Sequence, residues 1–412
     1  MTKFFSTFIA GLFFICSCTT DKPGQAEQYP EASLLIQDAL RNSLFTGAVL
    51  LIGSGNEIVH HKAYGYATLY NEDLRVVPEP DSMTTGHLFD IASLTKIFAT
   101  TYGLMALHSD DEIELDEPVV TYFPEFDKPG HRDITIRHLL SHTSGLLQWY
   151  PTYYVANNAV ERRNFTANYP LLGVPGEQRR YSDLGFMLLG DIIEQTAGMP
   201  LAEYLDQRIY SKLGLNSTRF TPNDQASVPI VSTSHGNPFE RKMVYDPDFG
   251  YNVDVDPDSW TGWREYTLKG EVNDGNAHYS HFGTAGHAGL FSTAEDLYTL
   301  LQLVMNGGVH QGDVIIRPES IDQFTTEDQF GNGLGWAMEA STLNAKELPP
   351  GSVGHTGFTG TNFVMNIADG HLYILLTNRQ HVGVDSDGQY PNLRSLREEI
   401  AIELFNNKDR LN

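Results

Sequence analysis

The chain has 412 residues and a formal net charge of −25, from 52 acidic and 27 basic side chains. Hydrophobic residues make up 41% of it and charged residues 19%, which is enough apolar material for a folded core and excludes a disordered chain. Because nucleic-acid phosphates and anionic lipids attract basic surfaces, the excess of acid argues against nucleic-acid binding and against adsorption to anionic membranes.

The N-terminal segment has the pattern of an export signal. Lys3 precedes an apolar stretch, residues 4–15, that is too short to span a bilayer. We predict a signal peptide over residues 1–18, which ends in a sequence resembling a lipoprotein box, with Cys18 as the lipidated first residue of the mature chain. A secretory signal cleaved nearby is the alternative, because Cys16 stands where the box usually has a small residue. Residues 19–30 are polar and are predicted to form a tether.

Strand patterns near both ends of the chain predict one antiparallel sheet of five strands. The expected strands cover residues 45–52, 57–66, 353–357, 361–367 and 372–377. Such a sheet must cover its apolar faces, and helices are predicted at about residues 31–42 and 392–405. The sequence therefore predicts an α/β (α+β) fold in which terminal helices flank the sheet.

The middle of the chain is predicted to be mostly helical, with amphipathic helices near residues 184–197 and 294–306. Residues 221–283 are rich in Asn, Asp, Pro and aromatic residues without clear periodicity, and we expect long surface loops over a cleft. We expect one catalytic domain over residues 31–412. Its sheet part is expected at about 31–92 and 346–412, and its helical part at about 93–345.

Ser93 and Lys96 form a candidate nucleophile pair. Three positions apart in a helix, they lie on one face, which puts an ammonium beside a hydroxyl as an acyl-transfer nucleophile requires. No other serine in the chain has a lysine at this spacing. The pattern is common by chance, however, and an exposed serine near a solvated lysine is the alternative.

Tyr181 is the candidate base, because it lies at the expected start of a helix, where backbone N–H groups favour negative charge. Beside Lys96, its phenolate would accept the Ser93 proton. Tyrosine ordinarily titrates near ~10, so this role requires nearby cations that lower its pKa. An aromatic residue that packs a helix start capped by Asp183 is the alternative. The same tyrosine pattern recurs at Tyr204 and Tyr390.

A third motif, His-Thr-Gly-Phe, begins at His355 on a predicted strand. The glycine allows close approach of a ligand. Amides of this strand, together with the Ser93 amide, would donate to a developing oxyanion. His355 or the Thr356 hydroxyl would hold a substrate carboxylate. A histidine on a sheet surface is the commoner alternative.

In this order, the three motifs resemble those of the serine β-lactamase and penicillin-binding protein superfamily, and most closely its class C branch with DD-peptidases and esterases. The resemblance covers about residues 40–405 and extends to stretches at 135–146, 289–297 and 376–379. Residues 270–277 and 285–289 are similar to a subgroup that contains DD-carboxypeptidase-type penicillin-binding proteins. This resemblance implies a β-lactamase/transpeptidase-like fold.

The resemblance also implies a role for each motif. Ser93 would be the acyl-enzyme nucleophile, Lys96 the proton relay and Tyr181 the general base. The substrate would be lined by His355, Thr356 and Gly357, and the oxyanion hole formed by the amides of Ser93 and Phe358.

Two positions depart from the usual pattern of the superfamily. Asp183 stands in place of asparagine, and its carboxylate would keep Lys96 charged and repel an anionic substrate. His355 stands in place of lysine, which favours peptide or ester substrates over lactams.

Further polar residues lie in the stretches that resemble the subgroup. Expected at the rim of the cleft are Asp274, Asn276 and His287. For each of them a purely structural role is the alternative. His138 and His142 are four apart on one predicted helix, but core packing is favoured over a metal pair. We predict no metal and no cofactor.

We therefore predict an exported serine hydrolase, anchored by lipid in the cell envelope facing the periplasm or the cell surface, and monomeric. Its expected partner is a peptidoglycan fragment or a small amide or ester, with D-amino-acid peptide bonds preferred. A β-lactamase or an esterase with the same machinery is the alternative. A catalytically weak muropeptide- or penicillin-binding sensor also remains open, because Asp183 departs from the pattern.

Overall fold

The computed structural model describes residues 29–222 and 228–406. Its helices are α1 (Pro30–Arg41), α2 (Tyr102–Ser109), α3 (Ile136–Leu140), α4 (Ala159–Asn168), α5 (Asp183–Ala197), α6 (Leu201–Leu205), α7 (Pro238–Tyr245), α8 (Ala294–Met305), α9 (Pro318–Thr325) and α10 (Arg394–Asn406). The predicted signal peptide, Cys18 and the tether up to residue 28 lie outside the described residues.

Within residues 29–222 and 228–406 the strands form one large sheet and three small ones. The large sheet contains β1 (Gly47–Ser54), β2 (Glu57–Tyr70), β3 (Val76–Ser82), β11 (Ser352–Thr356), β12 (Asn362–Asn366) and β13 (His371–Thr377). The small sheets contain β4 (Phe89–Asp90), β5 (Arg219–Phe220), β6 (Ser232–His235), β7 (Thr267–Lys269), β8 (Leu290–Ser292), β9 (Val309–His310) and β10 (Asp313–Val314).

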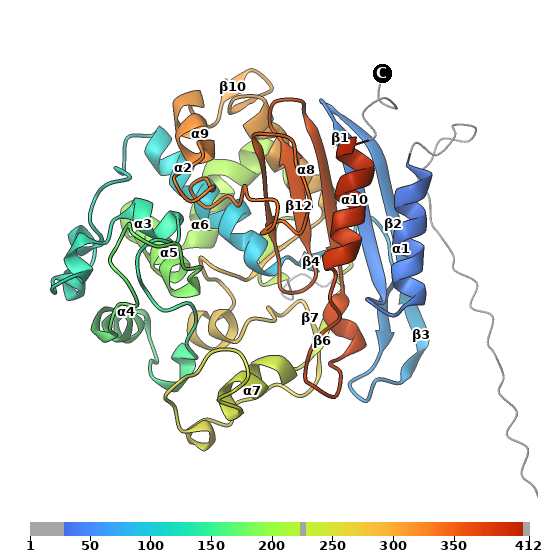
Figure 1. The fold of residues 1–412 in the computed structure, drawn as a ribbon, viewed down its shortest axis with the longest axis horizontal. Coiled ribbons are helices and arrows are strands. Elements are labelled where there is room, and N and C mark those ends of the chain that lie inside the picture. Colours follow the sequence, from blue (N-terminus) through green and yellow to red (C-terminus); the bar gives the residue numbers. More distant parts are fainter. Residues whose placement is uncertain (1–28, 223–227, 407–412) are drawn as a thin grey trace, which may run out of the picture.

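The large sheet is antiparallel, in the order β11-β12-β13-β1-β2-β3 (Figure 1). Its centre joins the two ends of the chain, because Leu50 of β1 lies opposite Leu375 of β13. This is the predicted α+β arrangement, and all five expected strands are present. The sixth strand, β3, was missed because its sequence contains two prolines and no apolar alternation, which is tolerated at a sheet edge.

Helices cover both faces of the large sheet. On one face lie α1 and α10, side by side (Figure 1), where Leu50 packs in one cluster with Ile36 and Leu396. On the other face Leu51 belongs to the main core, together with Leu297 of α8. Because both faces of β1 are buried, the strand is apolar throughout, which is why it appeared in the sequence as an unbroken run.

The helical part follows the sequence pattern closely, except in the segment predicted to be loops. Helix α5 ends at Gly198, whose φ of +66° terminates it in the left-handed conformation. Residues 221–283 are not only loops, because they contain β6, α7 and β7. The expectation of long loops there was therefore only partly right.

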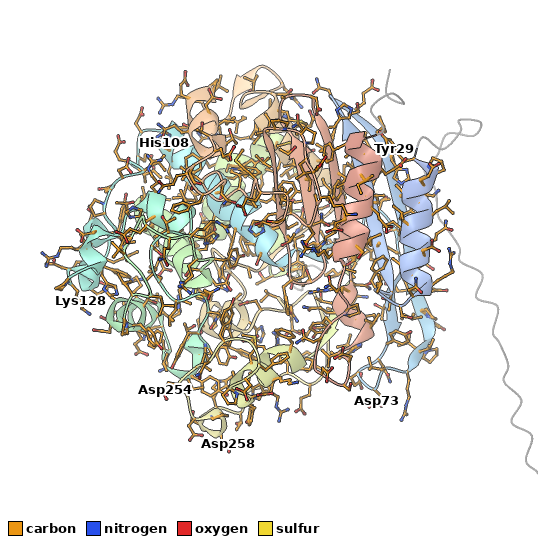
Figure 2. The ribbon with its side chains drawn as sticks, in the orientation of Figure 1. Tyr29, Asp73, His108, Lys128, Asp254 and Asp258 are labelled. Carbon is orange, nitrogen blue, oxygen red and sulfur yellow. The ribbon has the colours of Figure 1, made fainter. Side chains whose placement is uncertain are left out.

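The surface carries much of the charge of the chain. Asp73 and Asp258 lie at the periphery of the molecule (Figure 2) and are exposed. Of the helices in the described part of the chain, none has both the length and the apolar character needed to cross a bilayer.

Candidate active site

Ser93 lies in a tight turn after β4. The turn consists of a 3-10 segment, η1 (Ala92–Leu94), followed by a π-helical segment, η2 (Lys96–Thr101), that leads into α2. Ala92 has a φ of +48°, a left-handed conformation that is costly for a residue with a side chain. Backbone strain and π-helical segments both concentrate at functional sites.

The Asp90 carboxylate holds this turn in place. One of its oxygens accepts a hydrogen bond from the Ala92 amide (2.9 Å), and the other accepts one from the Asn273 amide (2.6 Å). Burial raises the pKa of Asp90 to about 6, although both hydrogen bonds act in the opposite direction. Asp90 thus ties the segment before Ser93 to a loop that lies far away in the sequence.

Replacing Asp90 by alanine is expected to destabilise the fold. The substitution leaves two buried N–H groups without an acceptor, at a cost of about 1–3 kcal/mol each. Asp90→Asn keeps one acceptor oxygen, so its free energy of unfolding should fall less than that of Asp90→Ala. Urea unfolding of the three proteins measures the difference. An Asp90→Ala protein as stable as the unaltered one would contradict this role for the carboxylate.

Lys96 is fully buried among three oxygen atoms. Its Nζ lies 2.7 Å from the Asp183 carboxylate, 3.0 Å from the His287 carbonyl oxygen and 3.1 Å from Ser93 Oγ. Burial lowers the pKa of a lysine, but the Asp183 carboxylate opposes this effect and holds the pKa of Lys96 above its usual value. In the resting site Lys96 is therefore a charged donor to Ser93, as expected from Asp183.

Tyr181 stands immediately before α5 and beside Lys96. Lys96 Nζ lies 4.9 Å from the centroid of the Tyr181 ring, and Lys96 and Ser93 both act to lower the pKa of the Tyr181 hydroxyl. The helix is capped by Ser182, whose Oγ accepts a hydrogen bond from the third helical amide at 3.1 Å. Asp183 is therefore not the N-cap considered from the sequence, and its carboxylate pairs with Lys96 instead.

The pKa of Tyr181 is raised, although the sequence had led us to expect it to be lowered. Burial raises it most, the Lys96 ammonium lowers it, and the Asp183 carboxylate raises it again. The cation required for a lowered pKa is present, but burial and Asp183 outweigh it. Tyr181 is therefore protonated at neutral pH in the resting site.

Replacing Asp183 by asparagine is expected to move the pH profile of kcat/KM toward lower pH. Asp183 raises the pKa of Tyr181, so its removal lowers that pKa, and the phenolate that accepts a proton forms at lower pH. The rise of kcat/KM with pH should therefore have a lower midpoint, measured on a neutral p-nitrophenyl ester. Asp322→Asn removes an exposed carboxylate on α9 and serves as the control. Equal midpoints in all three proteins would contradict the assignment.

Strand β11 and the turn after it bring the third motif to the same cavity, with His355, Thr356, Gly357 and Phe358 in its wall. Gly357 is required there, because a Cβ would lie 2.6 Å from the Ile91 carbonyl oxygen. His355 is buried, and burial together with the nearby Lys96 lowers its pKa to about 3. Its ring is therefore neutral and offers no charge to a substrate carboxylate.

Two backbone amides of residues in the wall of this cavity remain available as donors. Among the residues that the structure describes, the amides of Ser93 and Phe358 donate to no other group. The Thr359 hydroxyl donates to the Asp90 carbonyl oxygen (2.7 Å) and so joins the turn after β11 to the turn that carries Ser93. Unused N–H donors beside a nucleophile are what a developing oxyanion requires.

The site opens into a cavity of about 710 Å³. Its wall includes Ser93, Tyr181, Asp183 and Asp274, the aromatic residues Trp149, Phe239, Tyr251, Phe358 and Tyr390, and the arginines Arg179, Arg379 and Arg397. A cavity of this volume is in the usual range for small-molecule sites.

The three residues expected at the cleft rim have different positions. Asp274 lines the cavity and accepts a hydrogen bond from His287 Nε2 at 2.9 Å. His287 is only 1% exposed, so it supports Asp274 and Lys96 from behind the wall. Asn276 is buried and accepts a hydrogen bond from the Thr152 amide at 2.8 Å. The rim position was therefore wrong for His287 and Asn276, which are buried structural residues.

His138 and His142 have separate structural roles. The His138 side chain takes part in the capping box of α3. The His142 ring packs 4.4 Å from the Tyr181 ring, centroid to centroid, and its Nδ1 accepts a hydrogen bond from the Ser182 amide at 3.1 Å. His142 therefore contributes to the position of Tyr181.

Sequence reasoning missed two groups of cavity residues. Glu240 of α7 lines the cavity and accepts a hydrogen bond from the Tyr153 hydroxyl (2.8 Å); burial and Asp274 raise its pKa to about 8. No sequence motif points to Glu240, because it lies in the segment 221–283 that is predicted to form loops. Arg379 ends the stretch 376–379, whose resemblance to the superfamily suggests no role for the arginine, and Arg397 lies within the predicted terminal helix, where no motif distinguishes it.

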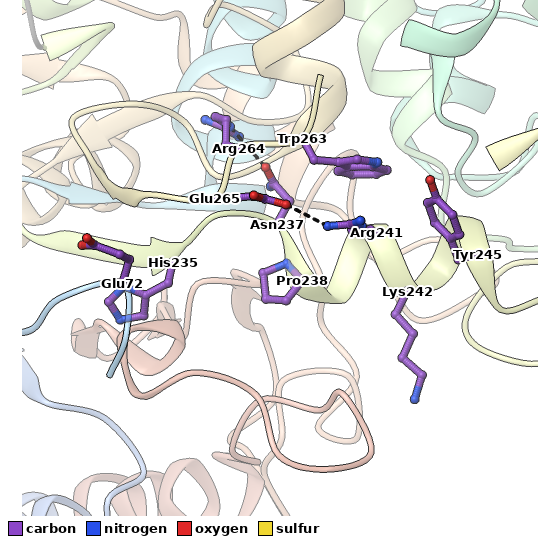
Figure 3. Close-up of a pocket in the computed structure, with 10 residues that line it drawn as sticks. All are labelled: Glu72, His235, Asn237, Pro238, Arg241, Lys242, Tyr245, Trp263, Arg264 and Glu265. Atoms are coloured by element: carbon purple, nitrogen blue, oxygen red, sulfur yellow. Dashed lines mark hydrogen bonds and ion pairs between the residues drawn. The ribbon is translucent and has the colours of Figure 1, made fainter. Parts of the chain in front are cut away.

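A second cavity, of about 380 Å³, lies beside α7 (Figure 3). Two of its arginines are engaged with neighbours: Arg241 pairs with Glu265 at 3.0 Å, and Arg264 donates to Asn237 at 3.1 Å. It contains none of the three sequence motifs. The candidate active site is therefore the larger cavity. The two cavities share one residue, Asn237, in their walls.

Known proteins are similar to this chain along most of its length. The family model described as Beta-lactamase matches residues 34–397. An Escherichia coli K12 protein named "Putative D-alanyl-D-alanine carboxypeptidase" is 33% identical over 369 residues, which cover 84% of this chain and 81% of that protein. A Bacillus subtilis 168 protein named N-acetylmuramyl-L-alanine amidase is 33% identical over 372 residues, which cover 85% of this chain and 80% of that protein.

Solved structures share the fold. A beta-lactamase/D-alanine carboxypeptidase from Pseudomonas syringae superposes with a TM-score of 0.64 at 19% identity and covers 92% of this chain and 98% of its own. A hydrolase with promiscuous acyltransferase activity has the same TM-score and coverage at 20% identity. At such identities the likeness concerns the fold alone.

Proposed function

This chain belongs to the beta-lactamase family of serine hydrolases, and we propose that it forms an acyl-enzyme at Ser93 and cleaves D-amino-acid peptide bonds of peptidoglycan, as a DD-carboxypeptidase does. The superfamily inferred from the three motifs is thereby confirmed. The observation that carries the proposal is Lys96 Nζ, 3.1 Å from Ser93 Oγ and beside the Tyr181 ring, in a substrate-sized cavity. The name of the Escherichia coli relative supports the choice of substrate.

Acylation begins when Tyr181 is ionised. Ser93 Oγ attacks the carbonyl carbon of the scissile amide while its proton passes to the Tyr181 phenolate. The charged Lys96 stabilises the phenolate, and the amides of Ser93 and Phe358 donate to the oxyanion. The Tyr181 hydroxyl then protonates the leaving amine, the C–N bond breaks, and an ester to Ser93 remains.

Deacylation reverses the roles with water in place of serine. Tyr181, again a phenolate, takes a proton from the attacking water, and the hydroxide adds to the ester carbonyl carbon. The tetrahedral intermediate collapses, the C–O bond to Ser93 breaks, and Tyr181 returns its proton to Ser93 Oγ. Because the pKa of Tyr181 is raised at rest, both steps are expected to be faster at alkaline pH.

The substrate class is tested with an acetylated peptide that ends in D-Ala-D-Ala. Release of free D-alanine, measured with a D-amino-acid oxidase assay, is the expected result. A peptide that ends in L-Ala-L-Ala serves as the control for chirality. Turnover of p-nitrophenyl esters without release of D-alanine would favour the esterase alternative, and turnover of penicillin alone would favour the β-lactamase alternative.

An amidase that removes the peptide from the lactyl group of a muramyl sugar is a second candidate. The name of the Bacillus subtilis relative favours it, and so does the aromatic lining of the cavity, since aromatic rings pack well against sugars. Both activities cleave an amide with the same groups. Digestion of one muropeptide separates them, because the amidase releases the sugar and the carboxypeptidase releases D-alanine. A sensor would accumulate the acyl-enzyme and release neither product.

We also propose that the protein is exported and held in the cell envelope by lipid on Cys18. The proposal rests on the N-terminal sequence pattern, and the relatives named for peptidoglycan chemistry support a location in the envelope. Labelling with radioactive palmitate of cells that express the full chain should mark the unaltered protein and not Cys18→Ala. Equal labelling of both proteins would contradict it.

A further inference from the structure

None of the three arginines in the cavity wall forms an ion pair within the described part of the chain, and two of them, Arg379 and Arg397, lie close enough for their charges to interact. Elsewhere most arginines pair with a carboxylate, as Arg137 does with Asp116 at 2.7 Å. For Arg379 and Arg397, no acidic side chain of residues 29–222 or 228–406 lies within ion-pair distance. The chain has 52 acidic and 27 basic residues, so acidic side chains are abundant and the missing partners are a local property of this wall.

The Arg397 side chain is buried, the Arg379 side chain is half-buried, and both guanidinium groups are only partly hydrogen-bonded. Arg397 is 6% exposed, and the Nε atoms of Arg397 and Arg379 are buried without a partner. Arg397 donates to the Thr361 carbonyl oxygen at 3.2 Å. Arg379 donates to the carbonyl oxygens of Pro391 and Phe358. These carbonyl groups orient the guanidinium groups but do not neutralise their charges.

The two charges also act on each other. Burial lowers the pKa of both arginines to about 10, and the charge of Arg397 contributes to the lowering at Arg379. Both remain charged at neutral pH. A buried and a half-buried cation that repel each other are costly, and an anion bound to both would offset that cost.

The two guanidinium groups lie in the wall of the substrate cavity, and aromatic rings restrict the position of one of them. Both arginines are part of the same wall as Ser93 and Tyr181. The Arg379 guanidinium carbon lies 5.4 Å from the centroid of the Phe358 ring and 5.9 Å from that of Tyr390, so two aromatic rings restrict its position. Arginine held in this way is suited to bind a carboxylate through two parallel hydrogen bonds.

We propose that Arg379 and Arg397 bind a carboxylate group of the peptide substrate. The neutral His355 is thereby replaced as the carboxylate-binding residue expected from the sequence. The carboxylate is either the terminal one or that of an acidic side chain, and the identity of the ligand as a substrate rests on the proposed function. Because Arg379 also donates to the Phe358 carbonyl oxygen, the subsite and the turn proposed to hold the oxyanion share one anchor.

Binding to a Ser93→Ala protein tests the subsite without any turnover. Three ligands are compared by calorimetry: acetyl-D-Ala-D-Ala, its neutral C-terminal amide, and acetyl-D-Glu-D-Ala amide, whose only carboxylate is in a side chain. One of the two carboxylated ligands should bind about tenfold more tightly than the neutral amide. The ligand that does so shows whether the subsite binds the terminal carboxylate or that of a side chain. Added to Ser93→Ala, Arg379→Gln or Arg397→Gln should abolish the preference.

Arg394→Gln is the matched control, because Arg394 also lies on α10 but is exposed and pairs with Glu398. It should retain the preference. Equal or undetectable binding of all three ligands to Ser93→Ala would overturn the proposal, and this comparison does not depend on whether the arginine variants fold. A preference that survives both arginine substitutions, or that Arg394→Gln also removes, would overturn it as well. Selective binding without release of D-alanine by the unaltered protein would instead count against the proposed peptidase activity alone.

Discussion

Replacing Ser93 by alanine is expected to abolish acylation and turnover of every substrate. The substitution removes the oxygen that forms the ester, while the Lys96 ammonium and both candidate oxyanion amides remain. Loss of the serine nucleophile lowers kcat by roughly 10⁶-fold in a serine protease with a catalytic triad, and we expect a loss of similar order here. The measurement is the steady-state rate of D-alanine release, together with hydrolysis of a p-nitrophenyl ester.

Ser386→Ala is the control for this substitution, because Ser386 is exposed in a loop after β13. It should keep the full rate. The Ser93→Ala protein should also unfold at nearly the same urea concentration as the unaltered protein, since only one hydroxyl that accepts from Lys96 is lost. Residual turnover within tenfold of the unaltered rate would show that another residue is the nucleophile.

Replacing Tyr181 by phenylalanine is expected to slow acylation by roughly 10²–10⁴-fold, the usual contribution of a general acid–base group. The ring and its packing against His142 are retained, so that only the hydroxyl beside Ser93 and Lys96 is lost. The alkaline rise of kcat/KM should disappear at the same time, because the titrating group is absent. Stopped-flow acylation by a fluorescent penicillin over a range of pH measures both effects.

Tyr204→Phe is the matched control for Tyr181→Phe. Tyr204 also precedes an acidic residue by two positions, but it lies in α6 within the main core, and it is not part of the cavity wall. Its substitution should leave acylation unchanged. If acylation were slow in Tyr204→Phe and unchanged in Tyr181→Phe, the base would have been assigned to the wrong motif.

The strands and most helices were predictable because local pattern determines them. The apolar run of β1 and the amphipathic repeat of α5 each reflect burial within one element. The edge strand β3 was not predicted, because its prolines argue against a strand, although a strand at the edge of a sheet tolerates them. The pairing of Ser93 with Lys96 was predictable for the same local reason, since both lie within one helical turn.

The rest of the site depends on contacts between distant segments. Asp90 lies three residues before Ser93, but its role depends on the amide of Asn273, 183 residues later. His287 was expected at a rim, yet its carbonyl oxygen accepts from the buried Lys96. The raised pKa of Tyr181 depends on how far the ring is buried, which spacing does not express. Such properties follow from tertiary packing, and no single motif carries them.

The subsite of Arg379 and Arg397 shows the same limit. One arginine follows a strand and the other lies on the terminal helix, and both sequence segments are ordinary. Their missing acidic partners become evident only once the two elements are packed together.

Formation of an acyl-enzyme at Ser93 is tested by the mass of the protein after brief exposure to penicillin. We predict that the intact mass increases by the mass of one penicillin molecule and that the proteolytic fragment containing Ser93 carries this increase. Ser93→Ala should show no increase. An adduct on any other residue, or release of D-alanine from a D-Ala-D-Ala peptide by Ser93→Ala at the unaltered rate, would contradict an acyl-enzyme at Ser93.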